Sequence, residues 1–235
     1  MIGNDTSLIS EELVAELSNL AILSMKTILN GRIADIQNSK RYSDFISDDV
    51  IDKLILKYNK THSFTVVVFL STSNTQCFEA SKGYIGTQDI FIKCEYSDDN
   101  WICNTLITMI NRLSRDPLRK VETPEKVEGE MKKTMLEEME KILSGKVWVE
   151  NYNNGDCNVI VANLIDKLNF KFPNYFFTLN CILRNDDSGF TSFSNNYCFY
   201  SKEDSTCFEI FNTNSDDLAK NSIFCTIYAS FFKNK

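Results

Sequence analysis

The strongest constraint on the fold of this chain is an internal repeat, because one order of expected elements occurs twice along its 235 residues. The first half predicts two helices and then four strands, at 9–29, 46–60, 64–70, 76–85, 88–96 and 101–110. The second half predicts the same order, at 124–143, 156–168, 175–183, 190–200, 206–212 and 222–232. Such a repeat is considered before any motif, since it changes which folds the whole chain can adopt.

Hydrophobic spacing underlies these assignments. In the expected helices, apolar residues recur every three or four positions, as in Leu13, Leu17 and Leu20 and in the methionine series of 131–139. The expected strands are rich in β-branched and aromatic residues, as in 64–70 (FTVVVFL). The methionine series could form a partner surface, but a periodic apolar stripe more commonly packs on its own core.

The two halves align when Phe64 is laid on Phe177, an offset of 113 residues. The helices then lie about 110 residues apart and the last strands about 121 apart, which requires only loop-sized insertions. A Ser-Asp-Asp turn precedes the last strand in both halves. Unrelated α+β segments can be slid into similar agreement, but here the order, lengths and turn positions of the elements agree together.

We therefore predict an α+β protein of two similar units, each with two helices packed on a mainly antiparallel four-stranded sheet. The expected domains are residues 1–113 and 123–235. The polar stretch 114–124 carries two of the three prolines, so residues 114–122 are the expected linker.

Composition indicates a folded protein that does not bind nucleic acid. Hydrophobic residues make up 43% of the chain and charged residues 24%, so a sizeable core can form. The net charge is −7, and Lys and Arg form no run that could follow a phosphate backbone. No stretch reaches the roughly 18 apolar residues that span a bilayer, and the acids near the N-terminus do not fit a secretory signal. We expect a cytoplasmic protein without a membrane partner.

The eight cysteines do not indicate a metal site. They include no C-x-x-C pair, and the chain has a single histidine, His62, whereas structural zinc sites use paired ligands at short spacing. Thiols stay reduced in the cytosol. Most of these cysteines lie in apolar, strand-like stretches, where cysteine packs as a small hydrophobic residue. No metal and no other cofactor is expected.

Catalytic motifs are absent from the sequence. It contains no G-x-S-x-G elbow, no Walker A loop and no dinucleotide-binding glycine motif. A cysteine nucleophile would need His62 as its base, so only its distance to Cys77, Cys94 or Cys103 could support such a site.

Two further features that resemble parts of active sites predict turns instead. Residues 82–86 (KGYIG) contain too little glycine to hold a phosphate group, and they read as a turn between strands. Adjacent aspartates at 98–99, 186–187 and 216–217 all lie among turn-forming residues, where they bond their own backbone. We expect no catalytic residue and no enzymatic activity.

The second half carries a pattern of short segments around cysteines and aromatic residues. These segments are Asn180-Cys181-Ile182-Leu183, Gly189-Phe190-Thr191, Cys198-Phe199-Tyr200-Ser201 with Asp204, and Ile223-Phe224-Cys225-Thr226. In this pattern residues 156–232 resemble a Tctex-type dynein light chain. Tyr200 stands where the family has Trp, Ser201 stands where it has Asp, and Gly189 lies further before Cys198 than usual. The resemblance covers about a third of the chain, and it reaches the first half only through the repeat.

The resemblance implies a fold and a non-catalytic function. Family members have two helices on a four-stranded antiparallel sheet, dimerise by sharing strands, and bind dynein intermediate chains or cargo peptides. Two copies in one chain imply an internal pseudo-dimer, whose tethering raises the local concentration of each half to around millimolar. The implied partners are a dynein intermediate chain or another light chain. The implied location is the cytoplasm, on the cytoskeleton or in a cilium.

The binding mode expected for such a module is strand addition, in which an extended peptide completes the ladder at a sheet edge. The candidate partner-binding residues lie on expected edge strands: Ile90, Ile92, Cys198, Phe199, Tyr200, Phe208 and Ile210. Two alternatives remain: an interaction module of similar fold in a cytosolic assembly unrelated to dynein, and a small cytosolic enzyme with an unrecognised site.

Overall fold

The computed structural model describes most of the chain. The described residues are 11–73, 75, 77–112, 123–149, 153–185, 191–199, 201–202, 204–213 and 222–233. They form an α+β fold of four helices and two antiparallel four-stranded sheets, which confirms the predicted fold class. The expected linker, residues 114–122, lies outside the described residues.

Each half of the chain begins with a pair of helices. The helices are α1 (Glu11–Leu29), α2 (Ile36–Tyr58), α3 (Pro124–Leu143) and α4 (Asn153–Lys171). α3 begins with proline in its first turn, where the missing N–H has no helical partner to lose. After α1 and α3 the chain passes through Gly31 and Gly145, whose φ angles of +72° and +73° suit glycine and end both helices alike.

α2 begins ten residues earlier than the predicted 46–60, and its burial explains the difference. Among residues 37–45 the buried positions are Ser39 and Ser43, so the sequence shows no apolar stripe there. Ser43 Oγ accepts a hydrogen bond at 3.4 Å from Ser192 Oγ of strand β6 (Thr191–Cys198), and Ser47 Oγ, one turn further along α2, lies 2.7 Å from Ser194 Oγ. This part of α2 therefore packs through hydrogen-bonded hydroxyl groups, which hydrophobic periodicity cannot detect.

Four strands follow the helices in each half. The strands are β1 (His62–Thr72), β2 (Cys77–Tyr84), β3 (Ile90–Ser97), β4 (Trp101–Asn111), β5 (Tyr175–Asn185), β6 (Thr191–Cys198), β7 (Ser205–Asn212) and β8 (Ile223–Lys233). Their lengths are 11, 8, 8 and 11 residues in the first half, and 11, 8, 8 and 11 in the second. The alignment of Phe64 with Phe177 puts β1 on β5 end to end.

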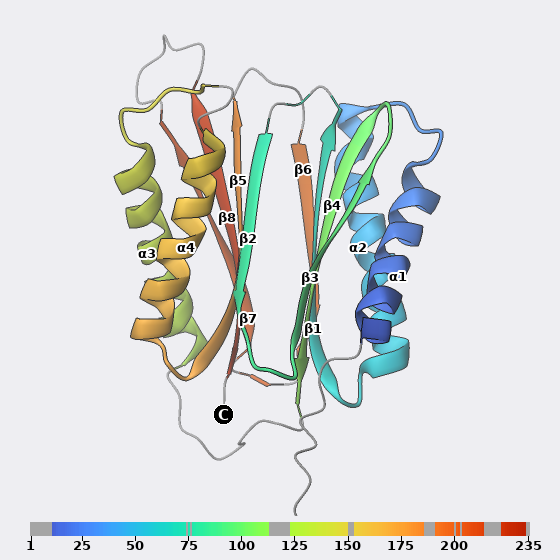
Figure 1. Cartoon of the computed structure of the whole chain (residues 1–235), viewed down its shortest axis with the longest axis horizontal. Helices are drawn as coiled ribbons and strands as arrows, with labels where there is room; N and C mark the ends of the chain where they lie inside the picture. Colours follow the sequence, from blue (N-terminus) through green and yellow to red (C-terminus); the bar gives the residue numbers. More distant parts are fainter. Residues whose placement is uncertain are drawn as a thin grey trace, which may run out of the picture. The chain divides into compact units, whose positions relative to one another are not determined.

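The second strand of each half belongs to the sheet of the other half. The sheet orders are β3-β4-β1-β6 and β2-β5-β8-β7, as can be followed in Figure 1 from the colours of β6 and β2. β6 pairs antiparallel with β1, where Phe64 faces Cys198. β2 pairs antiparallel with β5, where Phe177 faces Tyr84. The two exchanged ladders therefore have equivalent registers.

Two units result, and neither is a continuous segment. Unit 1 comprises Met1–Ser73, Ile85–Ser114 and Thr191–Tyr200, and unit 2 comprises Asn74–Tyr84, Arg115–Phe190 and Ser201–Lys235. This division differs from the contiguous segments 1–113 and 123–235 expected from the sequence. The difference arises because a strand belongs to the sheet that supplies its hydrogen bonds, whatever its place in the chain.

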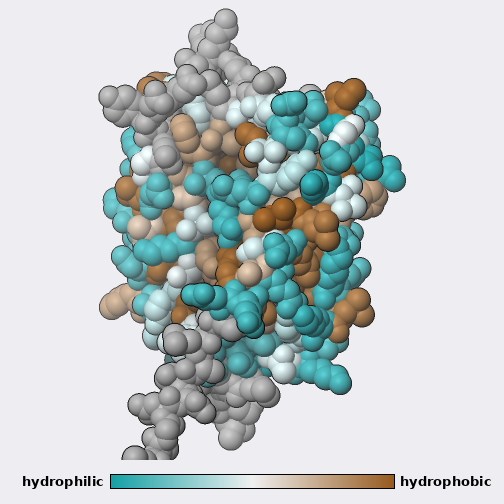
Figure 2. All heavy atoms as spheres, turned by 45° about the vertical axis from the view of Figure 1, so that its right-hand side comes forward, coloured by the Kyte–Doolittle hydropathy of each residue, from teal (hydrophilic) through white to brown (hydrophobic). Residues whose placement is uncertain are grey.

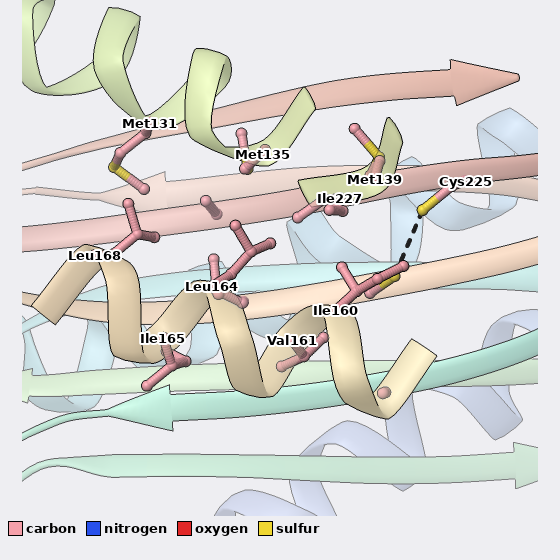
Figure 3. Packing of buried hydrophobic residues seen from close by; sticks show 14 of the residues in the cluster. Met131, Met135, Met139, Ile160, Val161, Leu164, Ile165, Leu168, Cys225 and Ile227 are labelled. Carbon is pink, nitrogen blue, oxygen red and sulfur yellow. Dashed lines mark hydrogen bonds between the residues drawn. The ribbon is translucent and has the colours of Figure 1, made fainter. Parts of the chain in front are cut away.

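Each unit has its own hydrophobic core between its helices and one face of its sheet. In unit 2, Met131, Met135 and Met139 of α3 meet Leu164 of α4 and Ile227 of β8 (Figure 3). The methionine stripe thus faces its own core. In unit 1 the corresponding core joins residues of α1 and α2 to alternate residues of β1, β3 and β4.

Ion pairs on the helices also repeat between the halves. Lys57 of α2 bonds Glu16 of α1, and Lys171 of α4 bonds Glu130 of α3. Both members of the second pair lie 114 residues after those of the first. The tetrapeptide Ile-Asp-Lys-Leu occurs at 51–54 and again at 165–168 with the same offset. The two halves therefore share identical surface residues as well as a pattern of elements.

Candidate functional site

The strands at the ends of the two sheets are the candidate binding elements. In unit 1 the end strands are β3 and β6, and in unit 2 they are β2 and β7. End strands can accept a further strand through their outward N–H and C=O groups. Which of the four suits a partner depends on the side chains that flank those groups.

β7 exposes apolar side chains on the sheet face that points away from the helices. Successive residues alternate between faces, so Cys207 and Phe211 join the core of unit 2, while Phe208 and Ile210 lie on the other face. Phe208 is 47% exposed and Ile210 49%. The Phe208 ring stacks on that of Tyr228 of β8, with centroids 5.6 Å apart and an interplanar angle of 20°.

β3, an end strand of the sheet in unit 1, presents a different surface. Ile90 is buried in the core of unit 1 and Ile92 is half-buried against it, so these two predicted binding residues contribute their side chains to the core. On the opposite face Lys93 and Glu95 form an ion pair of 2.7 Å. A partner at β3 would therefore meet charges beside the strand.

Two predicted binding residues, Cys198 and Phe199, lie at the end of β6. Cys198 faces Phe64 of β1 and packs against the core of unit 1. The ring of Phe199 stacks on that of Tyr197, with centroids 4.6 Å apart. Tyr200 lies outside the described residues. Tyr197 is exposed and was not among the predicted residues.

The predicted residues thus fall into separate groups. Phe208 and Ile210 lie together in unit 2, whereas Ile90, Ile92 and Cys198 belong to unit 1. Lys93 and Glu95 were not among the predicted residues. The alternation of 205–212 (STCFEIFN) and 90–97 (IFIKCEYS) could have identified both outward faces once the core-facing residues of each strand were assigned.

Large apolar side chains are also exposed on the helices, at equivalent positions of the two halves. The pairs, each separated by 114 residues, are Ile22 and Leu136, Phe45 and Val159, and Leu56 and Phe170. Figure 2 shows hydrophobic side chains at several places among hydrophilic ones on one face of the molecule. Unlike β7, the helices offer no outward row of backbone groups to order a partner.

His62 is placed poorly for cysteine activation. Cys103 faces Leu70, eight residues further along β1, which corresponds to about 27 Å at roughly 3.4 Å per residue. Cys94 faces Thr105, which faces Val68, so it lies about 20 Å along the strand from His62 by the same spacing. Cys77 belongs to unit 2.

The surroundings of the His62 ring are those of a packed side chain. Its Nδ1 lies 2.7 Å from Thr61 Oγ1, and the rings of Tyr58 and Phe64 flank it. Burial, together with the positive charge of Arg112, lowers the pKa of His62. Neutral imidazole therefore predominates at pH 7.

Several thiols are held in the protonated form by burial. Burial raises the pKa of Cys157 and of Cys181 well above that of a free thiol, and it raises the pKa of Cys207 to about 12. Cys181 lies 3.6 Å from Cys225 between their sulfur atoms, inside the core of unit 2 (Figure 3). Since the thiolate is the nucleophile, these cysteines act as core residues.

Of the aspartate pairs singled out in the sequence, the described one includes Asp98, which serves a turn. Asp98 Oδ1 accepts from the backbone N–H of Asn100 at 2.9 Å and of Trp101 at 2.8 Å, which confirms the predicted turn. The pairs 186–187 and 216–217 lie outside the described residues. Across the described part of the chain, His, Cys, Asp and Glu form no group that could hold a metal ion.

A buried aspartate stabilises the end of the fourth strand in each half. Asp89 Oδ1 accepts from the backbone N–H of Asn111 at 2.7 Å, and Asp204 Oδ1 accepts from that of Lys233 at 2.8 Å. Both aspartates are buried and precede the third strand of their half. Each carboxylate ties that turn to the end of the fourth strand.

A buried carboxylate lies between the helices of unit 2. Glu138 of α3 is fully buried, receives a 2.7 Å hydrogen bond from Asn163 Nδ2 and pairs with Lys167 of α4. Burial works to raise the pKa of Glu138, but the bonds from Lys167 and Asn163 outweigh it and lower the pKa. In unit 1 the equivalent place holds Ser24, bonded to Asp49 at 2.5 Å.

Comparison with known proteins adds no relative. No protein-family model matches the chain, and no curated protein matches it either. Among the described residues, none of the helices is long and apolar enough to cross a membrane. The function must therefore be argued from the fold and from the surfaces of its end strands.

Proposed function

We propose that this chain is a non-catalytic scaffold that binds a segment of another protein by adding it as a strand to one of its sheets. The observation that carries this proposal is the pair of four-stranded sheets that exchange their second strands. A sheet that already completes itself with a strand from elsewhere in the chain uses the same hydrogen bonding that a partner strand would use.

The protein class proposed for this chain is that of the Tctex-type dynein light chains. Strand sharing between two α+β halves is what the resemblance of residues 156–232 implies, and the exchange of β2 and β6 is in keeping with it. The proposed partner is a segment of a dynein intermediate chain or of another light chain, and the proposed location is the cytoplasm, on the cytoskeleton or in a cilium.

The absence of catalysis is part of the proposal. Its support is that His62 is packed against aromatic rings and that several cysteines have pKa values raised by burial. Buried aspartates such as Asp89 and Asp204 are occupied with backbone N–H groups, so they support the sheet.

The test is binding of the purified full chain to peptides that tile the light-chain-binding region of a dynein intermediate chain. Isothermal titration calorimetry should give saturable binding to at least one peptide and none to its proline-substituted version, because proline removes a ladder N–H. Equal binding of both versions would exclude strand addition. If all the tiled peptides fail while a cytosolic partner is captured through a sheet edge, the dynein link is wrong and the interaction module in another assembly is favoured.

A further inference from the structure

The end strands β3 and β7 occupy equivalent positions in the two units. In the first half Ile90 faces Met109 of β4, and in the second half Ser205 faces Phe231 of β8. An offset of 115 residues therefore relates the two strands. At this offset Lys93 corresponds to Phe208, and Glu95 corresponds to Ile210.

The surface of β3 opposes the addition of an apolar strand. Lys93 and Glu95 form an ion pair at 2.7 Å, and the Glu95 side chain is 68% exposed. A partner with apolar residues on this face would remove water from both charges without replacing it, which is unfavourable. Charged side chains on an end strand are also a common means of preventing unwanted pairing.

The surface of β7 favours such an addition. Phe208 and Ile210 are about half exposed, and Phe208 already stacks on Tyr228. Covering these side chains would bury apolar area that the free chain leaves in water, which is favourable. Among the described residues, β7 is the only end strand with two large apolar side chains exposed in this way.

The other two end strands are less suited. β2 places Glu79 and Lys82 along its length, and the Glu79 carboxylate accepts a 2.7 Å hydrogen bond from Asn180 Nδ2. β6 is rich in Ser and Asn, and its Asn196 bonds Asp48 of α2. Among the described residues of these two strands, one large apolar side chain is exposed on each, Tyr84 on β2 and Tyr197 on β6, against two on β7.

The charge of Glu209 on β7 would favour a basic residue on the partner strand, between the two apolar residues that cover Phe208 and Ile210. On the helix-facing side of β7 lies Glu209, near enough to Lys132 of α3 for their charges to interact. Lys132 is already paired with Glu128 at 2.7 Å. A positive side chain on the partner would thus find Glu209 beside it, and the chain's net charge of −7 would attract such a segment from a distance.

We infer that the partner strand adds to β7 and not to β3, so that each chain has one site, formed by unit 2. The partner is an extended protein segment with two apolar residues two positions apart and a basic residue between them. This inference rests on the proposed strand-binding function and specifies where it operates and what it selects.

The experiment is a nuclear magnetic resonance titration of the ¹⁵N-labelled full chain with the synthetic peptide Ser-Thr-Val-Lys-Val-Thr-Ser. Backbone amides of Ser205–Asn212 should shift and saturate, whereas those of Ile90–Ser97 should not. The peptide with Glu in place of Lys should bind at least about threefold more weakly, because it meets Glu209 with like charge. Shifts in β3, or no saturable shifts in β7, would overturn the inference.

Reciprocal variants locate the determinant. Phe208→Lys with Ile210→Glu copies the β3 surface onto β7 and should weaken binding about tenfold or more. Lys93→Phe with Glu95→Ile copies the β7 surface onto β3 and should raise the number of bound peptides from one to two. Ile210→Thr is a milder variant that keeps a β-branched residue, so it guards against loss of folding and should weaken binding by a smaller factor.

The control is the charge exchange Lys93→Glu with Glu95→Lys, which should leave binding unchanged. Loss of binding in this control would assign the site to β3 and overturn the inference. If the intermediate-chain peptides bind but shift only β3, β2 or β6, the proposed function stands and this inference fails. If the chain binds neither those peptides nor the synthetic one, both fail.

Discussion

The third strands of the two units pair in the same register but expose different side chains. β3 and β7 pair with the fourth strand of their half in the same register, yet one carries an ion pair and the other carries exposed Phe208 and Ile210. Inside the units many equivalent positions keep the same role in the core. The difference teaches that pairing and core packing constrain both copies, while the outward face of an end strand is free to diverge and to acquire a partner.

The interior of the two units has changed less. Met25 and Met139 occupy equivalent core positions, and so do Leu29 and Leu143. A core position contacts many neighbours at once, so a change there needs several others to accompany it. An exposed position on β7 contacts few residues and can change alone.

The largest effect is expected from separating the two halves. A chain of residues 1–113 lacks β6, so β1 would lose the partner that it pairs with from Phe64 to Ser71. We expect this fragment to form dimers or aggregates, because an open apolar strand edge recruits another strand. Size-exclusion chromatography with light scattering measures this. A stable monomer of 1–113 would show that the exchange is dispensable.

Truncation of equivalent core residues compares the two units directly. Phe64 and Phe177 are fully buried on β1 and β5, and each substitution Phe→Ala should lower the free energy of unfolding by about 3–5 kcal/mol. Urea unfolding followed by circular dichroism measures both. If the two cores contribute equally to stability, the two variants should lose similar amounts of unfolding free energy. A loss confined to one variant would mean that the two cores carry unequal shares of the stability.

The buried carboxylate of unit 2 predicts a pH-dependent difference between the units. Glu138→Gln should lower stability by about 2–3 kcal/mol at pH 7, less than for a wholly buried pair because the Lys167 side chain is 44% exposed. The folded-state pKa of Glu138 is lowered from its ordinary value of 4.5, so the stabilisation is complete above about that pH and is lost as pH falls through the folded-state pKa.

Urea unfolding at a series of pH values tests this. The wild type and Glu138→Gln should converge as the pH falls through the folded-state pKa. Ser24→Ala, at the equivalent place in unit 1, serves as the control, since it removes a hydroxyl and not a titrating carboxylate. A constant difference between the wild type and Glu138→Gln across the acid range would contradict the role given to Glu138.

The buried aspartates should have a smaller effect that is shared by both units. Asp89 also accepts from the backbone N–H of Gly86 at 2.9 Å. Asp89→Ala leaves the N–H of Asn111 without its carboxylate and Asp204→Ala leaves that of Lys233, at a cost of about 1–2 kcal/mol for each N–H that loses its acceptor. Hydrogen exchange of those two amides should accelerate in the matching variant alone. Asp99→Ala, at an exposed turn position, is the control and should change neither amide.

The smallest effect is expected at the exposed helix positions. Leu56 is 85% exposed and Phe170 is 91% exposed, so replacing either by Ser should change the free energy of unfolding by less than about 0.5 kcal/mol. Thermal unfolding measures this. A larger loss at either position would mean that its side chain makes stabilising contacts that its exposure does not reveal.

The sequence allowed much of the fold to be predicted. The helix pairs, the four strands of each half and the offset from Phe64 to Phe177 follow from hydrophobic period and turn residues, which depend on neighbours close in the chain. The first turns of α2 were not predicted because their buried side chains are serines, one of which is hydrogen-bonded to β6. The sequence predicted two continuous domains, but each unit combines separate segments because β2 and β6 are exchanged.

The candidate site was predicted only in part. Phe208 and Ile210 were identified as edge residues and lie exposed on β7, while Ile90 and Ile92, chosen by the same reasoning, face the core of unit 1. Apolar residues on an end strand read alike in sequence whether they face a helix or water, because the face is set by the strand's register with its neighbour.

The sequence by itself determined the repeated order of elements and most of the apolar stripes of the helices, since both depend on local spacing. Only the tertiary structure decided which sheet each second strand joins and which side of β3 and β7 points outward. The physical reason is that strand pairing joins residues far apart in the chain. Its hydrogen bonds are made by the backbone, which is the same for every sequence, so partner and register are fixed only when whole surfaces pack together.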